Sequence, residues 1–240
     1  RKHRNAVTQI RHGRNQFCIK EYQARGVLDS IGRYVRASRA HRGLTGARYL
    51  KSHGIGTPNM IALVTDKQKC YLVMDYIEGE DLRQRMDRLG AINEEEAIII
   101  GAAICDALSY LHSRTPPVVH RDIKPSNLII NDNGHVTITD FGLVKFKGVS
   151  KLTVIGSTVG TLAYMSPEQA TGKQVDQRSD VFSLGAVFYE MLTGLPPFVG
   201  EYDAAVLYSL VNEEPVSLSQ HRAGIPDDLE TIVFKALAKD

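Results

Sequence analysis

The sequence contains no hydrophobic run long enough to cross a membrane. Its longest uninterrupted apolar stretch is the nine residues 97–105, whereas a membrane-spanning helix needs about 20. Cysteine is also scarce: Cys18, Cys70 and Cys105 lie far apart, with the spacing of neither a metal site nor a disulfide framework. An odd, scattered set of cysteines is typical of a reducing compartment, so we expect a cytoplasmic domain.

The sequence begins at Arg1 without a methionine, and nothing near its start resembles a signal peptide. We therefore expect a segment of a longer protein, truncated at both ends, with any membrane anchor of that protein lying outside the segment. Its 240 residues can bury a sizeable core as one large domain or as two lobes.

Acidic residues are rare in the first part of the chain. Residues 1–51 contain 13 Lys and Arg but only Glu21 and Asp29, whereas the remainder contains 16 basic and 25 acidic residues. A basic surplus of this kind can face a polyanion or an anionic membrane surface. Without interleaved aromatic residues we favour a solvated basic face over nucleic-acid binding, and we keep contact with an anionic surface as the alternative.

The hydrophobic pattern changes character along the chain. Strands are predicted at residues 7–10 and 17–21, around a His-Gly-Arg-Asn turn, and at 61–65 and 71–76. Residues 25–52 favour a helix that is broken near Gly43 and Gly46. Beyond the junction at residues 77–79, short strands are predicted at 128–130 and 136–139, and helices at 93–113, capped by Asn93, and near 179–193, 202–212 and 227–238.

The densest chemical signal is His120-Arg-Asp-Ile-Lys-Pro-Ser-Asn127, followed thirteen residues later by Asp140-Phe-Gly142. Carboxylates and an asparagine in loops beside short apolar strands suit Mg²⁺, which prefers hard oxygen ligands. Phosphoryl transfer needs a carboxylate placed near the attacking hydroxyl, together with cations that neutralise the phosphates. The alternative is a purely structural role, in which these residues only form turns and helix caps.

In combination with Gly160-Thr-x-x-Tyr-Met-Ser-Pro-Glu168 and Ser179-Asp-Val-Phe-Ser-Leu-Gly185, these motifs resemble the eukaryotic-type Ser/Thr protein kinases of bacteria. The resemblance covers residues 70–240. It implies a two-lobed, protein-kinase-like α+β fold with a small β-rich N-lobe, residues 1–77, and a larger helical C-lobe, residues 78–240. ATP and Mg²⁺ are the implied cofactors, and a protein that carries Ser or Thr is the implied substrate.

The resemblance also assigns roles by position. Asp122 corresponds to the catalytic base and Lys124 to the residue that neutralises the γ-phosphate, while Thr161 shapes the substrate pocket. Asn127 and Asp140 correspond to the Mg²⁺ ligands. The implied nucleotide contacts are Lys20 for phosphate, the gatekeeper Met74, Asp75 and Ile77 for adenine, Asp81 for ribose, and Ile129 beneath the base.

Two further acidic residues are expected to be structural. In the kinase family the residue that corresponds to Asp180 braces the backbone of the catalytic loop, and the one that corresponds to Glu168 pairs with an arginine that lies beyond the end of this sequence. Residues 143–160 correspond to the activation loop. Thr153, Ser157 and Thr158 are its hydroxyl residues, and Arg121 could bind a phosphate added nearby.

Two features of the kinase pattern are missing around Lys20. No Gly-x-Gly-x-x-Gly loop precedes it, and no carboxylate occurs between Asp29 and Asp66, where the pattern places the glutamate that holds this lysine. Glu21 is a poor substitute because neighbouring residues in a strand point to opposite faces. Bound ATP and Mg²⁺ would then supply the negative partner of Lys20.

The first 65 residues also resemble the lipopolysaccharide (Kdo/heptose) kinase family, which phosphorylates sugars of a membrane glycolipid. The resemblance rests on Lys20-Glu-Tyr22, Ser38-Arg-Ala40 and Tyr49-Leu-x-x-x-Gly-Ile-x-Thr-Pro58. The leading interpretation is an active Ser/Thr protein kinase. A pseudokinase or interaction module with impaired use of ATP, and a glycolipid-sugar kinase, are the alternatives.

Overall fold

The computed structural model describes residues 7–23, 39–66, 69–141 and 162–239. The chain divides into two compact units, with the boundary between Glu78 and Gly79.

The first unit is built on a four-stranded antiparallel sheet with the strand order β1-β2-β4-β3. Its elements are β1 (Val7–His12), β2 (Asn15–Gln23), α2 (Arg39–Ser52), β3 (Met60–Asp66) and β4 (Lys69–Asp75). The predicted hairpin is confirmed: β1 and β2 are joined by Gly13 and Arg14, and Gly13 has the positive φ of 62° that such a tight turn favours. The other two predicted strands are also present.

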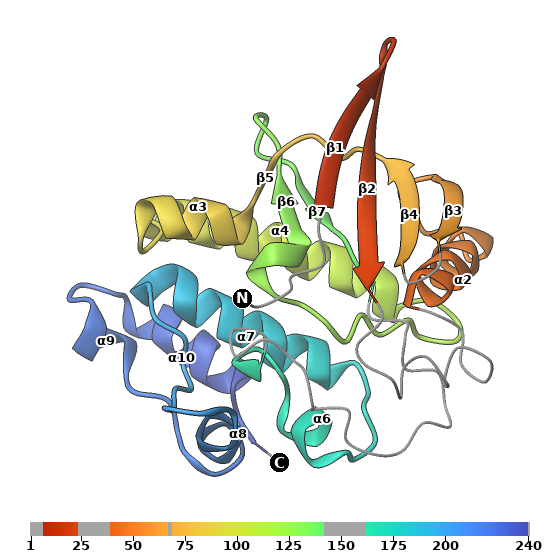
Figure 1. The fold of residues 1–240 in the computed structure, drawn as a ribbon. Helices are drawn as coiled ribbons and strands as arrows, with labels where there is room; N and C mark the ends of the chain where they lie inside the picture. Colours follow the sequence, from red (N-terminus) through yellow and green to blue (C-terminus); the bar gives the residue numbers. More distant parts are fainter. Residues whose placement is uncertain (1–6, 24–38, 67–68, 142–161, 240) are drawn as a thin grey trace. The chain divides into compact units, whose positions relative to one another are not determined.

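Helix α2 packs on this sheet beside β3 and β4 (Figure 1). The buried residues Ala40, Leu72 and Met74 form the core between the helix and the sheet. The predicted break near Gly43 and Gly46 is wrong, because α2 runs through both glycines. A Cβ atom at Gly43 would lie 3.3 Å from Leu72 Cδ2, so this glycine allows close approach of helix and sheet instead of ending the helix.

The second unit is mainly helical and includes a small three-stranded sheet of order β5-β6-β7. Its elements are β5 (Glu80–Asp81), α3 (Leu82–Leu89), α4 (Glu94–His112), the 3₁₀ helix η1 (Pro125–Asn127), β6 (Leu128–Ile130), β7 (Val136–Ile138), α6 (Pro167–Thr171), α7 (Arg178–Thr193), α8 (Asp203–Asn212), α9 (Leu218–His221) and α10 (Asp227–Ala236). The sheet-containing first unit and helical second unit confirm the predicted α+β architecture.

Helix α7 forms the centre of the second unit and packs against both α4 and α10 (Figure 1). Twelve of its sixteen residues are buried. Most residues on every face of the helix are accordingly apolar or small, as expected of a helix surrounded by others. A Cβ atom at Gly185 would lie 2.9 Å from the Cβ of Ala236, and this glycine therefore permits the close crossing of α7 and α10.

The predicted helices of the second unit are confirmed, while several short elements were not predicted. Asn93 caps α4 as expected, because its side chain accepts a hydrogen bond from the Glu96 N–H at 2.9 Å. The unpredicted elements are β5, α3, η1, α6 and α9. They are two to eight residues long, which is too short for a periodic pattern to emerge. Among the described residues, no helix has both the length and the apolar character that a membrane span needs.

A largely buried polar cluster joins α3, α7 and Tyr164, which lies just before α6. The Glu190 carboxylate accepts two hydrogen bonds of 2.9 Å from the Arg83 guanidinium and a further one from the Tyr164 hydroxyl. Burial raises the pKa of Glu190, against the opposing influence of Tyr164 and Arg83, and burial also raises the pKa of Tyr164. The cluster therefore satisfies groups that would be costly to leave unpaired.

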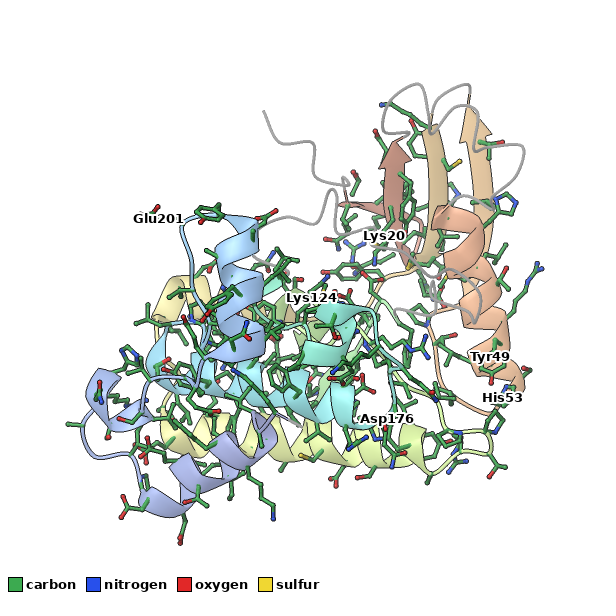
Figure 2. All side chains as sticks on the ribbon, turned by 90° about the horizontal axis from the view of Figure 1, so that it is seen from below. Lys20, Tyr49, His53, Lys124, Asp176 and Glu201 are labelled. Atoms are coloured by element: carbon green, nitrogen blue, oxygen red, sulfur yellow. The ribbon has the colours of Figure 1, made fainter. Side chains whose placement is uncertain are left out.

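We expect Glu190→Ala to lower the free energy of unfolding by about 1–3 kcal/mol, because it leaves the buried Tyr164 hydroxyl without its acceptor and removes the buried partner of the partly exposed Arg83. Urea unfolding measures the change. Asp176→Ala is the matched control (Figure 2): its ion pair with Arg178 is exposed, and its loss should cost at most about 1 kcal/mol. Equal losses in the two variants would contradict this account of the cluster.

Candidate active site

Asp180, near the start of α7, holds the backbone of the loop that precedes η1. Its carboxylate accepts hydrogen bonds from the His120 N–H at 2.8 Å and the Arg121 N–H at 2.7 Å. His112 Nε2, at the end of α4, lies 2.8 Å from the same carboxylate. The Asp180 side chain is fully buried, so these partners compensate for its loss of water. The structure thus confirms the bracing role expected of Asp180.

The loop backbone is strained where Asp180 holds it. Arg121 has a φ of 68°, in the left-handed region that a residue with a Cβ atom rarely adopts. Such a conformation costs on the order of 1–2 kcal/mol. It is maintained because surrounding bonds fix it, and strain held in this way is common at functional sites.

The ring of His120 lies beneath this loop and is completely buried. Its Nδ1 accepts the Asp122 N–H at 3.3 Å, so its Nε2 carries the proton and donates to the carbonyl oxygen of Thr139 at 3.1 Å. Burial lowers the pKa of His120. A neutral imidazole with a fixed tautomer therefore links the loop to the end of β7.

The Asp122 carboxylate is the centre of the polar groups in the loop. Its Oδ2 accepts hydrogen bonds from Lys124 Nζ at 2.8 Å and from Asn127 Nδ2 at 2.9 Å. Asn127 Nδ2 also donates to the Asp122 carbonyl oxygen at 2.7 Å. Asp122 keeps about a third of its side chain exposed, with 32% accessible, so it remains reachable by a substrate. The structure brings three of the predicted residues together here.

Asn127 and Asp140 come close together through the pairing of β6 with β7. The backbone N–H and the hydroxyl of Thr139 both donate to the Asn127 carbonyl oxygen, at 2.8 and 3.2 Å. Asp140 follows Thr139 directly, is exposed, and has a φ of 58° that turns the chain away from the strand. The next residue, Phe141, packs its ring 4.6 Å from that of His120.

These two residues fit a magnesium site. The hydrogen bonds that Asn127 makes to Asp122 use its amide nitrogen, so its side-chain oxygen can act as a ligand. Asp140 adds a carboxylate from the neighbouring chain segment. Mg²⁺ typically takes only one or two protein ligands in addition to phosphate oxygens and water. The described residues contain no cluster of three or more His, Cys, Asp or Glu that could hold a metal.

Two predicted nucleotide contacts of the second unit also lie together. Asp81 and Ile129 are direct partners where β5 pairs with β6. The Asp81 side chain caps α3 by accepting the Gln84 N–H at 2.9 Å, and its burial raises its pKa. Just before this strand, Gly79 has a φ of 138°, and a Cβ atom there would lie 2.5 Å from the Ile130 carbonyl oxygen. A glycine is therefore required where the chain enters β5.

The other predicted nucleotide contacts belong to the first unit. Lys20 lies on β2 (Figure 2), opposite Leu72 of β4 and Val7 of β1. Met74 is buried in the core beneath α2. Asp75 ends β4 and accepts hydrogen bonds from both the backbone and the side-chain nitrogen of Asn59, while Ile77 is half-buried in the segment that follows.

In the described part of the first unit, Glu21 is the acidic residue nearest to Lys20 in the sequence. Helix α2 contains no acidic residue in the sequence from Arg39 to Ser52. Glu21, the neighbour of Lys20, instead forms an ion pair with Lys69 of β4 at 2.9 Å.

Some predicted residues lie outside the part of the chain that the structure describes. These are Thr161 and the activation-loop residues Thr153, Ser157 and Thr158. Glu168 is described, and it accepts a hydrogen bond from the Ser179 hydroxyl. One contact to the catalytic loop was not predicted: Gln169 Nε2 donates to the Arg121 carbonyl oxygen at 2.9 Å. The Ser-Pro-Glu-Gln sequence of a capping box was its available signal.

The comparisons with known proteins also identify protein kinases. A model of the protein kinase domain matches residues 15–240. The chain is 43% identical over 171 residues to the serine/threonine-protein kinase PknB of Mycobacterium leprae, and 43% identical over 172 residues to that of Mycolicibacterium smegmatis. It is 42% identical over 172 residues to a probable serine/threonine-protein kinase of Streptomyces coelicolor, SCO3848. Each match covers 71% of this chain but only 25–27% of the relative, so the chain spans about a quarter of the length of these curated relatives.

We expect the free energy of unfolding to fall with pH below about 6.5, the ordinary pKa of histidine. In that range the unfolded chain binds a proton at His120, whereas the folded chain does not, so stability is lost as the pH decreases. Urea unfolding at several pH values measures the slope. The slope should be smaller by up to about 1.4 kcal/mol per pH unit in His120→Gln, and identical slopes in the two proteins would refute the buried neutral imidazole.

Proposed function

The chain belongs to the protein kinase domain family, and on this premise we propose that it transfers the γ-phosphoryl group of ATP to a serine or threonine hydroxyl of a protein. One observation carries the proposal. A partly exposed carboxylate, Asp122, is held by a lysine and an asparagine on a strained loop that a buried aspartate braces. The names of the bacterial relatives, which are serine/threonine-protein kinases, support the choice of acceptor.

In the proposed reaction the substrate hydroxyl attacks the γ-phosphorus. The new bond joins the hydroxyl oxygen to phosphorus, the bond from phosphorus to the bridging oxygen of the β-phosphate breaks, and ADP leaves. Asp122 orients the hydroxyl and accepts its proton. Lys124, whose Nζ lies 2.8 Å from Asp122, neutralises charge on the transferred phosphoryl group.

Asn127 and Asp140 would hold Mg²⁺, which when bound neutralises the phosphates and orients them. The hydrogen bonds of the Asn127 amide nitrogen to Asp122 connect this ligand to the base. Because one side chain serves both groups, the metal site and the base are positioned together.

For the nucleotide we propose the contacts that the family pattern indicates. Lys20 binds phosphate, Met74 borders the base, Asp75 and Ile77 offer backbone groups to adenine, and Asp81 and Ile129 contact ribose and the face of the base. For the substrate, Thr161 borders the acceptor pocket. The pairing of Asp81 with Ile129 across β5 and β6 supports a shared role for these two residues.

A protein acceptor is favoured over a sugar by Lys124, Thr161 and the Met-Ser-Pro-Glu segment. The resemblance of residues 1–65 to lipopolysaccharide kinases and the contact of the basic N-terminal region with an anionic surface both stay predictions. An assay with [γ-³²P]ATP and Mg²⁺ that offers a generic protein and a glycolipid acceptor separates the alternatives. Transfer to the glycolipid alone would overturn the proposed acceptor, and transfer to neither would overturn the proposed activity.

We expect Asp122→Asn to lower kcat for protein phosphorylation by about 10²- to 10⁴-fold, because it removes the group that accepts the proton. Steady-state assays measure the change, with equilibrium unfolding as the control for folding. Asp132→Asn, a change of an exposed residue in the turn between β6 and β7, should leave kcat within about twofold. A fully active Asp122→Asn variant would exclude Asp122 as the base.

We expect Lys20→Ala to lower kcat/KM for ATP by about 10- to 100-fold, because a charge-assisted hydrogen bond to phosphate contributes about 1.5–3 kcal/mol. Lys51→Ala is the control: this exposed lysine lies in the last turn of α2 and donates a hydrogen bond to Asn59 Oδ1. If the Lys20 variant keeps the wild-type kcat/KM, the assignment of Lys20 as the phosphate contact is wrong.

A further inference from the structure

The peptide group that joins Arg121 to Asp122 is held on both of its edges. Its N–H, from Asp122, donates to His120 Nδ1 at 3.3 Å. Its carbonyl oxygen, from Arg121, accepts a hydrogen bond from Gln169 Nε2 at 2.9 Å. This peptide group is the direct backbone support of the Asp122 side chain, so the two bonds limit how far that carboxylate can turn.

The orientation of the Gln169 amide is fixed by its other end. Its Oε1 accepts the Ser166 N–H at 3.0 Å, which only the oxygen of the amide can do. The Ser166 hydroxyl in turn accepts the Gln169 N–H, completing a capping box at the start of α6. Because the amide oxygen of Gln169 bonds the cap, the amide nitrogen faces the Arg121 carbonyl oxygen.

The backbone at Arg121 needs this support. Its φ of 68° is unfavourable for a non-glycine residue, and the Asp180 carboxylate fixes only its N–H. Gln169 fixes its carbonyl oxygen from a different element. Two anchors on opposite sides of one residue hold a strained conformation far better than either alone, because each removes a direction in which the loop could relax.

We propose that Gln169 is a positioning residue for the catalytic base: it tethers the cap of α6 to the Arg121 carbonyl and thereby maintains the orientation of Asp122. This inference deepens the proposed kinase function and rests on it for its effect on catalysis. Its structural part, the tether itself, can be measured without any activity.

Two substitutions separate the tether from the helix cap. Gln169→Glu keeps an oxygen for the Ser166 N–H, and glutamate is as suitable as glutamine in a capping box, but it replaces the donor to Arg121 by an oxygen. Ser166→Ala removes the hydroxyl that caps α6, while the Ser166 N–H remains to orient Gln169. The first should break the tether and spare the cap, and the second should do the reverse.

We expect Gln169→Glu to lower kcat about 10- to 100-fold, the scale of a small misplacement of a catalytic group, with the KM for ATP within about twofold. Ser166→Ala should keep kcat within about twofold and lower Tm by several degrees, since a lost cap costs about 1 kcal/mol. A merely structural role of Gln169 would instead give the same kcat and a lowered Tm in Gln169→Glu, and that result would overturn the proposal.

Hydrogen exchange read by mass spectrometry tests the tether independently of catalysis. The amides of Arg121 and Asp122 should exchange at least about tenfold faster in Gln169→Glu and at the wild-type rate in Ser166→Ala. Unchanged exchange in Gln169→Glu would overturn the tether even if the protein is active. If exchange is faster in Gln169→Glu but the wild-type protein transfers no phosphate, the tether is supported and only the proposed function is overturned.

Discussion

The loop that precedes η1 and carries the proposed catalytic base depends on one buried carboxylate. Asp180 projects from α7, the helix at the centre of the second unit, and accepts the backbone N–H groups of His120 and Arg121. A fully buried carboxylate is stable only if its charge is compensated, and these N–H groups together with His112 supply that compensation. The need to satisfy Asp180 and the need to hold the loop are therefore met by the same bonds.

From Asp180 the constraint reaches the proposed catalytic and metal-binding side chains through short contacts. The His120 ring connects the loop to Thr139, and Thr139 in turn fixes the carbonyl of Asn127 beside Asp140. The Asn127 amide then returns to Asp122. The proposed base Asp122 and the proposed metal ligand Asn127 thus belong to one hydrogen-bonded network, and Asp140 follows its member Thr139 directly in the chain. Because the members of the network support one another, weakening one of these hydrogen bonds should weaken the others.

Much of this arrangement was predictable from the sequence, and the rest was not for definable reasons. Helix α4, the β1–β2 hairpin and the Asp122–Asn127 pair were predictable because periodicity, a Gly turn and a dense motif are local signals. Short elements such as α3 and α6 lack a periodic signal. The passage of α2 through Gly43 depends on the distant Leu72, and the bond from Gln169 to Arg121 joins residues 48 positions apart. Tertiary neighbours decide such features, and a single sequence does not reveal them.

The central claim, that Asp180 holds the loop before η1 in its strained conformation, is tested most directly by hydrogen exchange at the His120 and Arg121 amides in Asp180→Asn. The isosteric amide keeps the volume but offers one acceptor oxygen in place of two, so one of the two N–H groups loses its partner. The account predicts exchange at least about tenfold faster at these amides, while the interior of α4 keeps its wild-type rate. Wild-type exchange at both amides in a folded Asp180→Asn protein would contradict it.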